Sequence, residues 1–230
     1  MKVAVINFSG NVGKSTVSRY LLAPRMNNAT IISVESINSD DNDESIRGKQ
    51  FGKLQESLAV LDNAIIDIGA SNVEDFIHQM KLYKGSHEDI DFFIVPTVQN
   101  SKQQRDTIST IDALNELGVK KEKIKLVFNM VEHDDDVEHT FSGLFKYHAI
   151  SDHFMINKEA AIQNNELYEK IKLSQTTIAE ILNDTVDYKE KLKIATNTEE
   201  KLHYAQRLAI KRLATGVNEE LDIVFSELFK

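Results

Sequence analysis

The chain has 230 residues, 41% of them hydrophobic, which is long enough for one α/β domain with a large core. Its net charge of −9 at pH 7 excludes a protein that coats DNA with its whole surface, so any nucleic-acid contact would need a local basic patch. The absence of cysteine excludes disulfides and thiolate metal sites and is compatible with a reducing cytoplasm, where we expect this protein. No apolar run approaches the roughly 18 residues of a membrane helix, so we expect no membrane anchor. The sequence begins directly with a predicted core strand, so we expect no cleavable signal.

The first predicted elements are an apolar strand at residues 2–7, a glycine-containing loop at residues 8–16, and a helix that begins at Val17. This order forms a cradle for phosphate, because glycine lets the backbone approach an anion and the first N–H groups of the helix point at it. Lys14 would reach the β- and γ-phosphates of a nucleotide, and the Ser15 hydroxyl would hold Mg²⁺.

The loop departs from the P-loop pattern G-x-x-x-x-G-K-[ST] at Phe8, which occupies the position of the first glycine. The tripeptide Gly13-Lys14-Ser15 is retained, and it lies between a predicted buried strand and a helix. This context favours a nucleotide-phosphate loop over an ordinary strand-to-helix turn.

A second strand is predicted at residues 30–35 and ends in Glu35, at the sheet edge where open α/β folds bind ligands. The polar segment 36–48 is either a solvated loop or a switch loop that supplies a carboxylate or amide beside the phosphates. After a helix over residues 50–61, strand 64–69 has the form of a Walker B strand, in which Asp67 would hold magnesium through water.

Strands and helices then continue to alternate, which predicts a mostly parallel central sheet with helices on both faces. The expected elements are helix 73–84, strand 91–96, helix 101–117 closed by Gly118, strand 123–129 ending in Asn129, a candidate sixth strand at 154–156, and helix 157–171. We expect a single P-loop domain, with an α/β core over about residues 1–170 and a helical C-terminal region over about 171–230 that turns near residues 183–184 and at Gly216.

Two charged regions have alternative interpretations. His133 and His139 flank acidic residues, for which a solvated acidic loop is favoured over a metal site. Residues 189–212 are the one basic region of an acidic chain. They form either a solvated helix surface or contacts with the phosphate backbone of nonspecific DNA, the second through Lys201, Arg207, Lys211 and Arg212.

The loop at residues 9–16, the strands that end at Glu35 and Asp67, and the strand end at residues 128–131 together resemble the ParA/MinD family of deviant Walker ATPases. This resemblance covers roughly residues 1–170. Residues 5–16 and 21–25 are similar to the plasmid-encoded StbB proteins of that family. The resemblance implies the family's fold, binding of ATP and Mg²⁺, a homodimer around nucleotide, a plasmid-encoded DNA-binding partner protein, and a role in plasmid stability, partition or positioning.

The resemblance also implies roles for individual residues. Lys14 would contact the β- and γ-phosphates, Thr16 the α-phosphate, and Asn129 the adenine, while Asp67 would be the Walker B carboxylate. Residues 129–132 lack the Asn-Lys-x-Asp pattern of many GTPases, which favours adenine over guanine. The nucleotide-binding set is Ser9, Gly10, Asn11, Val12, Gly13, Lys14, Ser15, Thr16 and Asn129; the catalytic set is Lys14, Glu35 and Asp67; the metal ligands are Ser15 and Asp67.

Two departures from the family pattern limit hydrolysis. Ser9 replaces the signature lysine that enters the partner subunit's site, and Ile37 replaces the second carboxylate of an Asp-x-Asp pair. Glu35, Asn38 or Asp40 could substitute for that carboxylate. We therefore expect slow or partner-stimulated hydrolysis. The alternatives are a nucleotide-binding switch with negligible hydrolysis that acts as an interaction protein, and a metabolic P-loop phosphotransferase or ligase.

Overall fold

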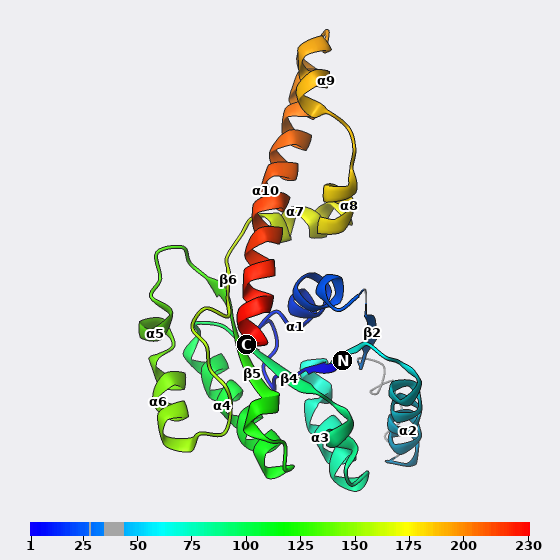
Figure 1. The fold of residues 1–230 in the computed structure, drawn as a ribbon, viewed down its shortest axis with the longest axis vertical. Helices are drawn as coiled ribbons and strands as arrows, with labels where there is room; N and C mark the ends of the chain where they lie inside the picture. The colour runs from blue at the N-terminus through cyan, green and yellow to red at the C-terminus, as the bar shows by residue number, and fades with distance from the viewer. Residues whose placement is uncertain (28, 35–43) are drawn as a thin grey trace. The chain divides into compact units, whose positions relative to one another are not determined.

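The computed structural model describes residues 1–27, 29–34 and 44–230 (Figure 1). The chain divides into two compact units. The first contains Met1–Gln163 together with Val224–Lys230, and the second contains Asn164–Ile223. Helix α10 (Thr198–Leu228) has residues in both units. No helix in these ranges is long and apolar enough to cross a membrane.

The described residues of the first unit form a six-stranded, wholly parallel sheet in the order β2-β3-β1-β4-β5-β6. This confirms the predicted parallel α/β architecture. Because β1 lies between β3 and β4, the chain order reverses beside it, and the loop that follows β1 lies at a topological switch point. The strands are β1 (Lys2–Val5), β2 (Thr30–Ser33), β3 (Ala64–Asp67), β4 (Phe92–Thr97), β5 (Ile124–Val131) and β6 (Ala161–Gln163).

The helices of this unit follow the predicted alternation. Helix α1 (Lys14–Thr16) continues as a π-helical segment (Val17–Leu22) and a 3₁₀ turn (Ala23–Arg25). The others are α2 (Glu44–Val60), α3 (Val73–Leu82), α4 (Ser101–Glu116), α5 (Val137–Thr140) and α6 (Ser142–Ser151). At the end of α4, Gly118 adopts a φ of 93° and Val119 N donates to Leu114 O at 3.1 Å, so Gly118 is the predicted helix-ending glycine.

Both faces of the sheet are buried. On one face, strand residues such as Ile66 and Phe93 pack against α2, α3, α4 and α6, and the rings of Phe51 and Phe76 meet at 5.6 Å between centroids. On the other face Val3, Val5, Ile65 and Ile94 are fully buried, and the π-helical segment packs on β3 through its own buried leucines. Figure 1 shows α2, α3 and α4 on one side of the sheet and the α1 segment on the other.

The prediction for residues 154–171 is wrong in part. Met155 forms an isolated bridge with Lys125, whereas the strand beside β5 is Ala161–Gln163, and the helix begins only at Leu167. Phe154 is fully buried in the core, whereas Met155 is 43% exposed and makes only the isolated bridge.

The second unit is helical, with α7 (Leu167–Ser174), α8 (Ile178–Asn183), α9 (Tyr188–Ile194) and most of α10. A capping box of Thr177 and Glu180 begins α8, and the predicted break near residue 183 is confirmed. The turn predicted at Gly216 is wrong, because α10 is continuous through it. A glycine inside a helix costs only about 1 kcal/mol, which the burial of Ala214, Val217 and Leu221 at helical spacing outweighs.

Candidate functional site

The loop between β1 and α1 has the backbone geometry of an anion cradle. Asn11 and Gly13 both adopt positive φ, 58° and 88°. A Cβ on Gly13 would lie 2.0 Å from Asn129 Nδ2, so the loop requires glycine there both sterically and conformationally. Within the described residues, the main-chain N–H groups of Gly10, Asn11, Val12 and Gly13 donate no hydrogen bond. These donors are therefore available to an anion.

Lys14 folds back over this loop. Its side chain is 8% exposed, and Nζ donates to the main-chain oxygens of Ser9 at 2.7 Å and Asn7 at 3.1 Å. Burial lowers the pKa of Lys14 to about 8, although the charge of Asp67 acts in the opposite direction. The two carbonyls thus hold the amine inside the curve of the loop.

Helix α4 supports the outer side of the loop. Ser9 Oγ donates to Asp106 Oδ2 at 2.8 Å, Phe8 N donates to Thr110 Oγ1 at 3.0 Å, and Gln103 Nε2 donates to Gly10 O at 2.9 Å. None of these three partners on α4 is expected from the sequence. Their only sequence signature is a polar stripe along one face of a helix, at spacings of three and four residues.

Asn7 connects the same loop to the sheet. Its fully buried amide donates to Pro96 O at 2.9 Å and to Thr107 Oγ1 at 2.8 Å, and its Oδ1 accepts from Ser9 N at 2.7 Å. The start of the loop is therefore fixed to both β4 and α4.

The predicted metal ligands lie on neighbouring elements. Ser15 is exposed on α1, directly after Lys14. Asp67 is 8% exposed at the end of β3, where it lies in register with Val5 of β1 and Ser33 of β2. Thr16, half-buried, ends α1. Glu35, Ile37, Asn38 and Asp40 lie outside the described residues, and so does most of the predicted switch loop.

Asn129 occupies a buried position behind the loop. It is 2% exposed on β5, and its Nδ2 donates to Val12 O at 3.0 Å. The amide therefore holds the loop in place from the sheet side. Its contact with adenine stays a prediction.

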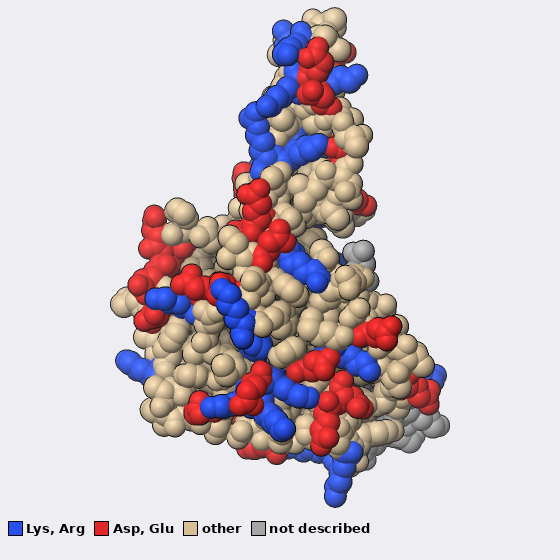
Figure 2. Space-filling view, viewed as in Figure 1, with Lys and Arg blue, Asp and Glu red and all other residues tan. Residues whose placement is uncertain are grey.

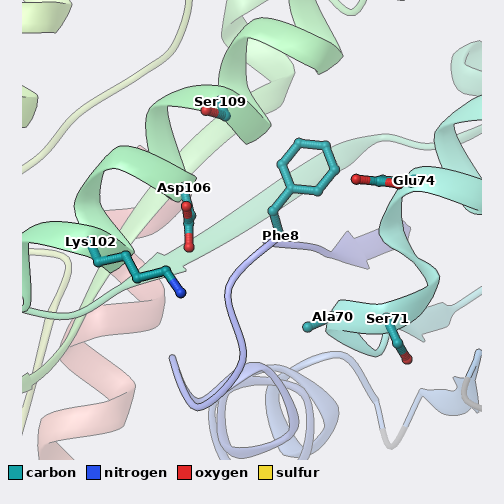
Figure 3. Close-up of a pocket in the computed structure, with 7 residues that line it drawn as sticks. All are labelled: Phe8, Ala70, Ser71, Glu74, Lys102, Asp106 and Ser109. Atoms are coloured by element: carbon teal, nitrogen blue, oxygen red, sulfur yellow. The ribbon is translucent and has the colours of Figure 1, made fainter.

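A cavity of about 600 Å³ opens beside the start of the loop (Figure 3). In this view the ring of Phe8 lies between α3 and α4, with Glu74 on one helix and Lys102 and Asp106 on the other. The lining residues are Phe8, Ala70, Ser71, Glu74, Lys102, Asp106 and Ser109.

The basic region divides into engaged and exposed residues. Within the second unit, Arg207 Nη2 lies 3.0 Å from Asp184 Oδ2, and Lys211 Nζ donates to Asp184 O. Lys201 and Arg212 are exposed. Figure 2 shows Lys and Arg side chains along α9 and the adjoining part of α10, with acidic side chains beside them.

The histidines of the acidic loop do not assemble a metal site. Across residues 1–27, 29–34 and 44–230, no group of three or more His, Asp or Glu side chains is placed to hold a metal ion. His133 Nδ1 instead lies 3.3 Å from Gln163 Oε1, the neighbouring strand's side chain.

Comparison with known proteins gave matches among solved structures alone. No protein-family model matches the chain. No curated protein matches it either. Apo McdA from Cyanothece aligns over 94% of this chain and 98% of its own, with a TM-score of 0.51 and 12% identity. The cell division ATPase MinD from Pyrococcus furiosus aligns over 90% and 98%, with a TM-score of 0.52 and 12% identity.

A second MinD gives a similar result. The septum site-determining protein MinD from Pyrococcus horikoshii OT3, complexed with Mg-ADP, aligns over 97% of this chain and 98% of its own, with a TM-score of 0.50 and 13% identity. These matches agree with the wholly parallel sheet. The chain therefore has the ParA/MinD-type P-loop ATPase fold that its sequence predicts.

Proposed function

We propose that this chain is a Mg²⁺- and ATP-binding ATPase of the ParA/MinD type that acts as a nucleotide-dependent dimerisation switch in plasmid stability, partition or positioning. The observation that carries the proposal is the loop at residues 10–13, whose free N–H groups and positive φ angles surround the amine of Lys14. The Mg-ADP complex of the similarly folded Pyrococcus horikoshii MinD supports the choice of ligand.

The residues present fit a magnesium nucleotide. The N–H groups of residues 10–16 and the start of α1 bind the phosphates, and Asn11 and Gly13 set the backbone conformation that this requires. Ser15 directly and Asp67 through water would hold Mg²⁺, which would supply positive charge against the phosphate oxygens. Thr16 contacts the α-phosphate.

Lys14 supplies the positive charge of this site. Its amine donates to the carbonyls of Ser9 and Asn7, which are neutral acceptors. Phosphate oxygens are charged acceptors, so the hydrogen bonds to them are stronger. The amine exchanges one set of acceptors for the other, and the loop needs no large rearrangement, because α4 and β5 hold it from both sides.

Hydrolysis is slow or depends on a partner. Ser9 carries no charge, and its hydroxyl donates to Asp106. This contact also favours the second candidate, a nucleotide-binding switch with negligible turnover. Glu35 remains the proposed carboxylate near the attacking water, and Asp67 the Walker B carboxylate.

The proposed partners are a second copy of the chain, a plasmid-encoded DNA-binding protein, and nonspecific DNA. The plasmid role rests on the resemblance of residues 5–16 and 21–25 to StbB proteins. For DNA, Lys201 and Arg212 are the better candidates, because Arg207 and Lys211 are engaged with Asp184.

The switch is tested by measuring the solution mass of the protein by sedimentation, without nucleotide and with Mg-ADP or Mg-ATP, together with phosphate release. We expect a shift from monomer to dimer with Mg-ATP and no such shift for Lys14→Ala. A mass that is the same in all conditions would contradict the switch, and phosphate release at background with or without DNA would leave the non-hydrolysing switch in place of the ATPase.

A further inference from the structure

A cation is missing from the loop position where the family's signature lysine lies. Ser9 occupies that position. It is 7% exposed, and its hydroxyl donates a hydrogen bond to Asp106. The amine of Lys14 lies on the inner side of the loop, where it donates to main-chain carbonyls. In a dimer around nucleotide, each bound triphosphate would therefore lack the lysine that the family pattern brings from the partner subunit.

Lys102 lies on the outer side of the loop, where α4 lies. It is the second residue of α4, and its neighbour Gln103 donates to Gly10 O at 2.9 Å, which brings the first turn of α4 against the loop. Lys102 lines the same cavity as Phe8 and Asp106. Figure 3 shows its amine pointing toward the loop segment that follows Phe8.

The amine of Lys102 is also available. Lys102 is exposed. Within the described residues its amine forms no hydrogen bond and no ion pair, although two carboxylates line the same cavity. One of these carboxylates, Asp106, already accepts a hydrogen bond from Ser9 Oγ. A lysine has a long flexible stem, so an unengaged amine at this place can move toward a ligand in the loop at little cost.

Resting on the function proposed above, we propose that Lys102 supplies, within the same chain, the cation that Ser9 does not. Its amine binds the terminal phosphate of ATP over the outer edge of Gly10. In the family pattern this charge comes from the loop of the partner subunit, whereas here it comes from the first turn of α4 in the same chain. Because ADP lacks the terminal phosphate, Lys102 distinguishes ATP from ADP.

The test compares three variants: Lys102→Met, which removes the charge but keeps the stem; Lys102→Arg, which keeps the charge; and Arg105→Met, a matched control. Arg105 is an exposed cation on the same helix that does not line the cavity. Dissociation constants for Mg-ATP and Mg-ADP are measured by calorimetry, and thermal unfolding verifies folding.

We expect Lys102→Met to weaken ATP binding about tenfold and ADP binding less than about twofold, because one charge-assisted hydrogen bond to the terminal phosphate is lost. Lys102→Arg and Arg105→Met should stay close to the wild type. An ATP-to-ADP affinity ratio in Lys102→Met that equals the wild-type ratio would overturn the assignment alone. A wild-type protein that binds neither nucleotide would overturn the proposed function as well, so the two failures are distinguishable.

Discussion

Gly13→Ala tests the packing behind the loop. The new Cβ would lie 2.0 Å from Asn129 Nδ2 and 3.1 Å from Asn129 Cγ, which is far inside contact distance. Asn129 is 2% exposed, so its amide has no open space to move into. Displacing it breaks the 3.0 Å hydrogen bond to Val12 O.

Two effects set the expected loss of unfolding free energy in Gly13→Ala. Alanine at a φ of 88° costs about 1–2 kcal/mol of backbone strain. A lost buried hydrogen bond costs about 1–2 kcal/mol more, because it leaves a carbonyl unsatisfied. We therefore expect Gly13→Ala to lower the free energy of unfolding by about 2–4 kcal/mol, measured by urea denaturation.

The control and the partner substitution make the prediction specific. Gly10→Ala should be nearly neutral for stability, because a Cβ there has nothing within 4 Å. Asn129→Ala removes the atoms that clash, so the double variant should be more stable than the sum of the two single effects by about 1 kcal/mol or more. Additive effects, or a Gly13→Ala variant as stable as Gly10→Ala, would refute the reasoning.

Three further predictions concern other parts of the chain. Nucleotide affinity should be constant at low pH and fall as pH rises through about 8. The reason is that the pKa of Lys14 is lowered to about 8 and the phosphates bind only the protonated amine. Calorimetry from pH 6.5 to 9 measures this dependence, and a pH-independent affinity would contradict it. Gly216→Ala should stabilise α10 by about 0.5–1 kcal/mol in thermal unfolding, since a Cβ there has nothing within 4 Å; destabilisation would argue for a break at Gly216. Lys201→Glu with Arg212→Glu should weaken nonspecific DNA binding and reduce its salt dependence without loss of helicity, whereas Arg207→Glu should disturb the second unit through Asp184; an unchanged salt dependence would exclude this surface.

The main architecture was predictable because its patterns are strong. The strands around Val5, Asp67 and Phe128 are nearly continuous apolar runs, as buried parallel strands require. The glycine and lysine of the loop then predict that the carboxyl end of the first strand binds a ligand. Local sequence patterns indicate both the buried strands and the phosphate-binding loop, so one sequence without homologues was enough to predict the α/β architecture.

The errors come from tertiary context. β6 is short and its sequence is less apolar than residues 154–156, where Phe154 fills the core and Met155 makes only an isolated bridge to the sheet. Gly216 is tolerated in α10 because burial outweighs its helix penalty. Likewise, no local pattern indicates that Asp106 binds Ser9 or that Asn129 binds Val12 O, because each pair is joined only by folding.

The central claim is that the loop at residues 10–16 binds a magnesium nucleotide through Lys14. The most direct test is calorimetric titration of the wild type and of Lys14→Ala with Mg-ATP. We predict saturable binding at one site per chain, weakened by about 10- to 100-fold in Lys14→Ala, as expected for loss of a hydrogen-bonded charge on phosphate. Equal binding by the two proteins, or no binding by the wild type, would contradict the account.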